Sequence, residues 1–260
     1  MPTIATWNVN SVNARLPNVL AWLAEARPDV ALLQEIKCLD PAFPTEAVGE
    51  LGYNVATLGQ KAYNGVAILS RRPIEDVVRG LPGEPADEQA RYIEATVGDL
   101  RVASIYLPNG NPIGTDRFAY KLAWMERLRA HAAALLELDQ AVVLGGDFNV
   151  IPEPIDCHDP RAWLGDALFQ PESRRAFRSL LHLGYTEAFR ALHPDERGAY
   201  SFWDYQGGAF QLDHGIRIDH LLLSPQAADR LARCSIDKNP RRQPKASDHT
   251  PVVVELNDRP

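Results

Sequence analysis

The stretch QAVVLGGDFNV, residues 140–150, decides the fold class of this chain. It begins with a continuous apolar run, which is typical of a strand buried inside a sheet. The run passes through two glycines and ends in Asp147 and Asn149. A carboxylate at the end of a buried strand is costly unless it is paired or bound to a cation. The stretch therefore predicts a sheet with polar chemistry at one end of its strands.

Strand patterns of the same kind recur on both sides of this stretch, and helical patterns fall between them. The predicted strands are 3–9, 29–36, 53–58, 65–70, 90–97, 100–107, 140–148, 216–224 and 250–256, and the predicted helices are 16–26, 44–51, 116–138, 173–183 and 225–231. Only Gly98 and Asp99 separate two of these strands, which indicates a hairpin. We therefore expect an α/β fold with mixed sheets.

The composition is that of an ordinary globular protein. The chain has 260 residues, 45% of them hydrophobic and 23% charged, and its net charge is −7. This charge argues against broad electrostatic binding of nucleic acid, although a local basic patch still allows it. Loops rich in proline and glycine are short, because strand or helix patterns resume within about a dozen residues. One domain over residues 1–260 is predicted.

Targeting and cysteine signals are weak. The chain has no run of about 18 apolar residues, and residues 1–10 do not resemble a secretory signal peptide. We therefore expect a cytoplasmic protein that does not bind membranes. Cys38, Cys157 and Cys234 lie far apart and follow no metal-binding spacing, so reduced, unreactive thiols are expected.

Polar side chains cluster at the ends of five predicted strands. They are Asn8 and Asn10, Gln34 and Glu35, Asp147 and Asn149, Asp219 and His220, and Asp248 and His249. Each alone has an ordinary structural explanation, such as a turn or a strand end that meets solvent. Together they indicate one shared pocket.

The residue types in this pocket predict metal-assisted cleavage of a phosphoester. Glu35, Asp147, Asp248 and the Asn8 amide supply the oxygen ligands that Mg²⁺ prefers when it shares a substrate phosphate. His249 can act as an acid or base that a neighbouring carboxylate orients.

Nine motifs occur in the order found in one known family. They are TWNVNSVNAR (6–15), LLQEIKC (32–38), YNGVAILSR (63–71), RYIEA (91–95), IYLPNG (105–110), GGDFNV (145–150), YSFWDY (200–205), RIDHLLLS (217–224) and SDHTPVVVEL (247–256). From about residue 3 to residue 256 the chain resembles the exonuclease III group of apurinic/apyrimidinic (AP) endonucleases. This group belongs to the endonuclease/exonuclease/phosphatase superfamily, which has the DNase I-like fold.

The resemblance implies a four-layered α/β sandwich in which two packed mixed β-sheets are flanked by helices. It also implies site residues. The catalytic set is Tyr106, Asp147, Asn149, Asp219 and His249; the metal set is Asn8, Glu35, Asp147, Asn149, Asp248 and His249; and the substrate-binding set is Asn109, Phe202, Trp203, Ile216, Arg241 and Arg242. Phe202, Ile216 and Ile218 match a small pocket for a sugar turned out of the duplex. Arg241 and Arg242 belong to a basic run beside the SDH motif.

The function implied is that of a Mg²⁺-dependent DNA-repair phosphodiesterase, with Mn²⁺ as a substitute ion. It would act as a monomer on double-stranded DNA, cutting 5′ to abasic sites and trimming or cleaning 3′ ends. Superfamily relatives that cleave inositol phosphates, sphingomyelin or RNA ends are the enzymatic alternative. A phosphate-binding scaffold with a decayed site is the non-enzymatic one.

Two histidines depart from the family pattern, one directly after Asp219 and one in the loop IPEPIDCHDP that follows GGDFNV. His220 occupies a position that is more commonly apolar or tyrosine, so it is either a support for Asp219 or a surface residue. His158 either overhangs the site and affects substrate choice or faces solvent. The number of metal ions also stays open, as does the group that protonates the leaving oxygen, for which Tyr106 and a metal-bound water are the alternatives.

Overall fold

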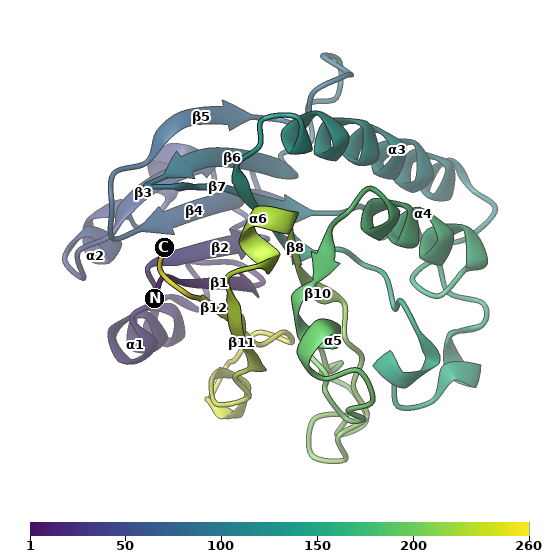
Figure 1. Cartoon of the computed structure of the whole chain (residues 1–260). Coiled ribbons are helices and arrows are strands. Elements are labelled where there is room, and N and C mark those ends of the chain that lie inside the picture. The colour runs from purple at the N-terminus through teal and green to yellow at the C-terminus, as the bar shows by residue number, and fades with distance from the viewer. Residues whose placement is uncertain (260) are drawn as a thin grey trace.

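The computed structural model describes residues 1–259, and two mixed sheets of six strands each pack face to face at its centre (Figure 1). The strand order in the first sheet is β11 (Leu231–Ile236), β12 (Val252–Leu256), β1 (Thr3–Asn8), β2 (Val30–Gln34), β4 (Val66–Ser70) and β3 (Asn54–Leu58). The order in the second is β5 (Glu75–Arg79), β6 (Tyr92–Val97), β7 (Leu100–Tyr106), β8 (Ala141–Asp147), β10 (Asp219–Leu223) and β9 (Thr186–Glu187). Each sheet contains parallel and antiparallel pairs, so the prediction of mixed sheets is confirmed.

The apolar runs form strands because both faces of each central strand are buried. Along β1, Ile4 packs into the core between the sheets, whereas Ala5 and Trp7 pack against the outer helices. In the second sheet, Val143 joins the inner core and Leu144 the outer one. This alternation divides the apolar side chains among one inner core and two outer cores.

Helices cover the outer faces of the sheets (Figure 1). The first sheet is covered by α1 (Leu16–Ala26) and α2 (Thr45–Gly49), and the second by α3 (Asp116–Leu136) and α4 (Pro171–His182). The short helices α5 (Ala188–Leu192) and α6 (Pro225–Ala228) add side chains to the inner core. The predicted four-layered sandwich is therefore confirmed. None of the helices in residues 1–259 is long and apolar enough to cross a membrane.

The strands and α-helices that the sequence did not predict are β5, β9, β11 and α5. The strands β5 and β11 are edge strands of their sheets, and most of their side chains are exposed or half-buried. Exposed charged residues are typical of edge strands and hide the apolar pattern that marks a buried strand. The strand β9 and the helix α5 are only two and five residues long.

The strand directions bring the predicted site residues to one end of the sandwich. Strands β1 and β2 run parallel, with Asn8 opposite Gln34. Strands β7 and β8 also run parallel, with Tyr106 opposite Asp147, and Asp147 pairs in turn with Asp219 at the start of β10. Polar strand ends from both sheets therefore meet across the inner core.

Candidate active site

Glu35, Asp147 and His249 meet at this end of the sandwich. One ligand atom of each side chain lies within 4.8 Å of those of the other two. Asp147 is 2% exposed and His249 is 4% exposed, while Glu35 is partly exposed. The three residues come from positions far apart in the sequence, so the fold rather than a local turn assembles the group.

Asn8 lies between the two carboxylates. Its Nδ2 donates hydrogen bonds to Glu35 Oε1 at 2.8 Å and to Asp147 Oδ2 at 3.0 Å. Its Oδ1 accepts from the backbone N–H of Asn10 at 3.0 Å. In this arrangement Asn8 bridges the two carboxylates as a hydrogen-bond donor.

Lys37 is the cation closest to Glu35. Its Nζ lies 2.7 Å from Glu35 Oε2 and donates to Asn10 Oδ1 at 2.6 Å. Burial favours the protonated form of Glu35, but the hydrogen bonds from Asn8 and Lys37 outweigh it and lower the pKa. Asn10, Glu35 and Lys37 all have positive φ angles, of 45°, 51° and 52°. Such strain in residues with side chains is typical of functional sites.

His249 is oriented by Asp219. Its Nδ1 lies 2.9 Å from Asp219 Oδ2, which also accepts a 2.6 Å hydrogen bond from Ser201 Oγ. Its Nε2 lies 3.7 Å from Asp147 Oδ2. Burial alone would lower the pKa of His249, but the charges of Asp219 and Asp147 raise it to about 10. The imidazole therefore presents a protonated Nε2 toward Asp147.

The carboxylates outnumber the cations around Asp147. Burial raises the pKa of Asp147 to about 7, and the negative charges of Asp219 and Glu35 add to this against the opposing charge of His249. Paired or ion-bound carboxylates are the ones that proteins keep buried. Because oxygen donors of this kind suit a hard divalent cation, the residues present fit such an ion.

Tyr106, Asn109 and Asn149 border the same group. Asn149 Oδ1 accepts a 3.1 Å hydrogen bond from Asn109 Nδ2, and Asn149 Nδ2 donates to Leu107 O at 2.9 Å. Burial, with Glu35 and Asp147 nearby, raises the pKa of Tyr106 well above its ordinary value. The phenol therefore keeps its proton.

Lys121 supports this border from beneath. It is fully buried on α3, and its Nζ donates to the backbone carbonyls of Asn109 at 3.0 Å and Asn149 at 2.6 Å. The two asparagines are thus fixed through their main chains as well as through their side chains. A lysine on an apolar helix face carries no motif, and sequence reasoning missed it.

A cavity of about 270 Å³ opens onto these groups. Phe202, Ile216 and Ile218 form part of its wall, as predicted from the resemblance, and the Phe202 ring lies 4.9 Å from the His249 ring. Four further lining residues were not predicted from the sequence: Trp163, Asp166, Leu168 and Asp204. Trp163 ends a short 3₁₀ helix (Pro160–Trp163), and Asp166 and Leu168 lie in the loop between it and α4, where no period or motif marks them.

Three of the predicted substrate-binding residues lie away from this cavity. Trp203 is fully buried, and its indole N–H donates to Asp213 Oδ1 at 3.0 Å, so its ring belongs to the core rather than to the substrate pocket. Arg241 and Arg242 line neighbouring grooves instead. Asp248 lines the cavity but stands outside the group formed by Glu35, Asp147 and His249, and its Oδ1 accepts from Asn10 Nδ2 at 3.1 Å.

His220 belongs to a second buried cluster, behind the cavity wall. Its Nδ1 lies 3.0 Å from Arg217 Nη1, its Nε2 lies 3.1 Å from Val150 O, and its ring packs against Phe148 and Phe177. It therefore does not contact Asp219 through a hydrogen bond, and it is not a surface residue. His158 is exposed and stacks on His214 with ring centroids 3.9 Å apart, outside the cavity.

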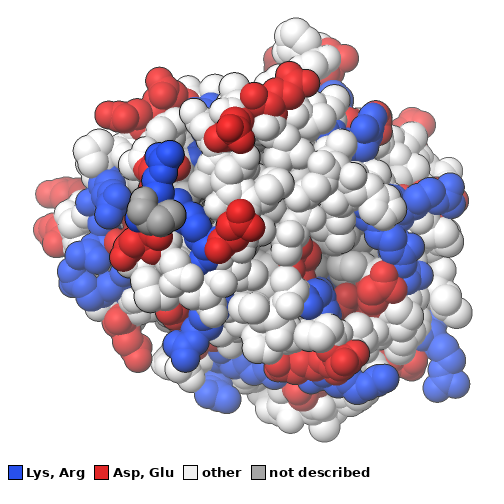
Figure 2. All heavy atoms as spheres, in the orientation of Figure 1, with Lys and Arg blue, Asp and Glu red and all other residues white. Residues whose placement is uncertain are grey.

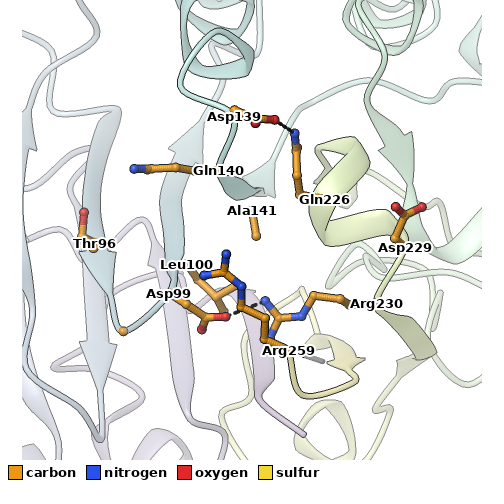
Figure 3. Close-up of a pocket in the computed structure, with 11 residues that line it drawn as sticks. Thr96, Asp99, Leu100, Asp139, Gln140, Ala141, Gln226, Asp229, Arg230 and Arg259 are labelled. Atoms are coloured by element: carbon orange, nitrogen blue, oxygen red, sulfur yellow. Dashed lines mark hydrogen bonds and ion pairs between the residues drawn. The ribbon is translucent and has the colours of Figure 1, made fainter.

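A cavity of about 530 Å³ lies at the opposite end of the second sheet (Figure 3). The residues around it come from the β6–β7 hairpin, the start of β8 and α6. Two of its carboxylates have local partners: Asp99 binds Arg230 at 2.7 Å, and Asp139 accepts from Gln226 at 2.6 Å. The crowded carboxylates thus belong to the end that carries Asp147.

Comparison with known proteins gives the family. Residues 5–249 match the model of the Endonuclease/Exonuclease/phosphatase family. The chain is 33% identical to exodeoxyribonuclease III of Haemophilus influenzae, over 96% of this chain and 98% of that protein. An AP endonuclease from Archaeoglobus fulgidus has a similar structure, with a TM-score of 0.95 and 40% identity over 99% and 100% of the two chains.

A second solved structure is equally similar. It is the 3′ phosphatase NExo from Neisseria bound to a product DNA hairpin, with a TM-score of 0.96 and 40% identity over 99% of this chain and 100% of that chain. These similarities span nearly the full length of both partners and therefore include every strand that contributes to the site. The chain belongs to the endonuclease/exonuclease/phosphatase family, within its exonuclease III group.

Proposed function

We propose that this exonuclease III-type nuclease uses Mg²⁺ to cut duplex DNA 5′ to abasic sites and to trim or clean 3′ ends. The observation that carries the proposal is the meeting of Glu35, Asp147 and His249 at the mouth of a partly apolar cavity. The similarity to an AP endonuclease and to a DNA-bound 3′ phosphatase supports the choice of DNA. We propose that the chain acts as one domain and as a monomer, and that Mn²⁺ can replace Mg²⁺.

The ion would be held by Glu35 and Asp147, with Asp248 and Asn149 at its border. A divalent cation there supplies positive charge that offsets the charge developing on the phosphoryl oxygens. Asn8 would keep the two carboxylates side by side through its two hydrogen bonds. Lys37 would balance part of the charge of Glu35.

Protein side chains then act on the water and the phosphate. Asp147 accepts the proton of the attacking water, which Asn149 helps to orient, as the water oxygen bonds to phosphorus. The bond to the 3′ oxygen breaks, and that oxygen takes up a proton, from Tyr106 or from a water, to become the 3′ hydroxyl. His249, fixed by Asp219 at 2.9 Å, donates from Nε2 to a phosphoryl oxygen. Tyr106 lines the same cavity and donates its phenolic hydrogen to the phosphate.

The cavity wall would select for abasic sites. Phe202, Ile216 and Ile218 offer apolar surface that accepts a sugar but gives no hydrogen-bond partner to the polar edge of a base. A nucleotide without a base is also the cheapest to turn out of the duplex, because it has no stacking or pairing to lose. Asn109, beside Asn149, would contact the sugar-phosphate backbone.

Three defined duplexes test this proposal: one with an internal abasic site, one intact with a recessed 3′ end, and one with a 3′ phosphate. We expect cleavage of the first to leave a 3′ hydroxyl on the 5′ side of the abasic site. Phe202→Ala should narrow the rate ratio between an abasic site and an intact internal pair by about tenfold or more. Leu138→Ala, an exposed change far from the cavity, is the control. An unaltered ratio in folded Phe202→Ala protein would contradict the pocket assignment.

A further inference from the structure

A separate groove of about 400 Å³ opens beside the active-site cavity. Its polar lining consists of Arg15, Tyr205, Arg241, Gln243 and Lys245. Arg15 directly precedes α1, and Tyr205 belongs to the YSFWDY segment. Arg241, Gln243 and Lys245 belong to the basic segment that precedes Asp248. Three of these five side chains are cationic and none is acidic, so the groove fits an anion.

The cations of this groove lack acidic partners. Among the ion pairs of residues 1–259, none involves Arg15, Arg241 or Lys245. The Nε atoms of Arg15 and Arg241 are both buried and have no hydrogen-bond partner. Unpartnered guanidinium nitrogens also occur at Arg101, Arg127 and Arg217, but each of those arginines pairs with a carboxylate. Arg15 and Arg241 have no carboxylate partner, so their charge is free to bind an anionic ligand.

The two guanidinium groups are held in place. Arg15 Nη2 donates to Tyr205 Oη at 3.1 Å, and Tyr205 Oη donates to Ala246 O at 3.0 Å. The Arg241 guanidinium lies over the Tyr205 ring at 5.3 Å and donates to Trp203 O at 3.2 Å. Cations that are fixed before binding lose little side-chain entropy when an anion arrives.

One residue joins the groove to the active site. Asn10 Nδ2 donates both to Tyr205 Oη at 3.3 Å and to Asp248 Oδ1 at 3.1 Å. Asn10 therefore links the groove to Asp248, which lines the active-site cavity. A DNA strand carries a negatively charged phosphate at every nucleotide. A strand that places one phosphate at His249 therefore also places a neighbouring phosphate close to that histidine.

The net charge of the chain does not attract DNA. The chain has a net charge of −7, and on the face shown in Figure 2 basic and acidic side chains are interspersed. Attraction of DNA therefore depends on local cations that no carboxylate neutralises.

We infer that Arg15 and Arg241 form a second phosphate subsite, which binds a backbone phosphate flanking the one that is cut, on the same strand. The inference rests on the proposed function, because it assumes a DNA substrate. Binding of this phosphate fixes the position of the strand along the protein and thereby selects which bond lies at Asp147.

Phosphate interference tests the subsite. Abasic duplexes, each with one uncharged methylphosphonate linkage at a successive position, are bound in EDTA and followed by fluorescence anisotropy. We expect wild-type binding to weaken by about tenfold at one flanking linkage, since hydrogen bonds between charged groups are the strong ones. Arg15→Met and Arg241→Met should bind the unmodified duplex about tenfold more weakly, become insensitive to that linkage and lower the salt slope of binding by about 1.

Arg233→Met is the matched control, because Arg233 is exposed on β11 and already pairs with Glu255. Arg15→Lys and Arg241→Lys, which keep the charge, should recover part of the affinity. A flat interference scan in a wild-type protein that cleaves abasic DNA would overturn the subsite and leave the proposed function standing. The expected interference pattern in a protein that cleaves none of the duplexes would support the subsite and contradict the proposed function. Competition by inorganic phosphate equal to that by DNA would show a simple anion site and overturn the role in strand positioning.

Discussion

Two buried clusters of charged side chains meet at the start of β10, and they are balanced differently. In the cluster behind the cavity, Arg217 binds Asp156 at 2.8 Å and Glu187 at 2.9 Å, and Arg190 binds Asp156 at 2.6 Å. Two guanidinium groups thus neutralise two carboxylates. In the cluster at the cavity mouth, the carboxylates outnumber the cations and no arginine pairs with Asp147 among the described residues.

The pKa values of the two clusters show what this difference means. Burial favours protonation of both Glu187 and Asp147. For Glu187, the charge of Arg217 and the hydrogen bond with His220 outweigh burial and lower the pKa to about 2. For Asp147, the charge of His249 and the hydrogen bond from Asn8 do not outweigh burial, and its pKa rises to about 7. A carboxylate that has its own cation stabilises the fold, whereas one that lacks a cation marks a place where an ion or substrate binds.

The largest effect is expected from exchanging one carboxylate in each cluster. Asp147→Asn should lower the cleavage rate of an abasic duplex by about 10³-fold or more, because the acceptor for the water proton is lost. Its free energy of unfolding should stay level or rise, because like-charge repulsion falls. Asp156→Asn should do the reverse, with stability lost and activity kept per folded molecule. Equal losses of stability in both variants would contradict the distinction.

Arg217→Met should remove the ion pairs that Arg217 makes with Asp156 and Glu187 in the cluster behind the cavity. Truncating one partner of a buried ion pair leaves the other charge unpaired, so we expect a loss of about 3–5 kcal/mol in the free energy of unfolding. Urea denaturation measures it. Arg233→Met, on an exposed pair, should change stability by less than about 0.5 kcal/mol. A loss as small for Arg217→Met would mean that its cluster does not hold the fold.

Acid stability should depend on Glu187. Because its pKa is lower in the folded chain than the ordinary value of 4.5, its stabilisation is complete above about pH 4.5 and is lost as the pH falls toward 2. Glu187→Gln should therefore be less stable than wild type at pH 7 and lose less stability between pH 5 and pH 3. Urea midpoints at pH 7, 5 and 3 test this, with the exposed change Glu172→Gln as control. Parallel curves for wild type and Glu187→Gln would rule out the role.

The smallest effect is expected from ion binding at the cavity mouth. An ion that binds only the folded chain at about ten times its dissociation constant adds about 1.4 kcal/mol. Mg²⁺ should therefore raise the unfolding temperature of wild type by a few degrees. Glu35→Ala should lose this shift, while Glu187→Gln should keep it. A shift of equal size in Glu35→Ala would place the ion elsewhere.

Much of the fold could be predicted from the sequence because its central strands are buried on both faces. The runs that became β2 and β8 are apolar up to their polar ends, and those that became β1 and β7 are mostly apolar, so their pattern is visible without tertiary context. The edge strands β5 and β11 carry exposed charged residues, and their pairing with β6 and β12 decides their structure. Local sequence does not contain that information.

The site residues also divide into those that the sequence predicts and those that it does not. Glu35, Asp147 and His249 follow or precede apolar strands, so their meeting follows from the strand directions. Leu168 reads as an ordinary core residue in the sequence and lines the cavity only because of how its loop packs. The pair of Asp156 and Arg217 joins positions 61 residues apart, which no local pattern predicts.

The central claim is that the carboxylates at the cavity mouth act with a divalent ion to cut a phosphodiester bond. Single-turnover cleavage of an abasic duplex by EDTA-treated protein, followed while Mg²⁺ is added back, tests it most directly. We predict no product in EDTA, full recovery with Mg²⁺ in the wild type, and recovery reduced by several orders of magnitude in Glu35→Ala. Full turnover in EDTA would contradict the claim.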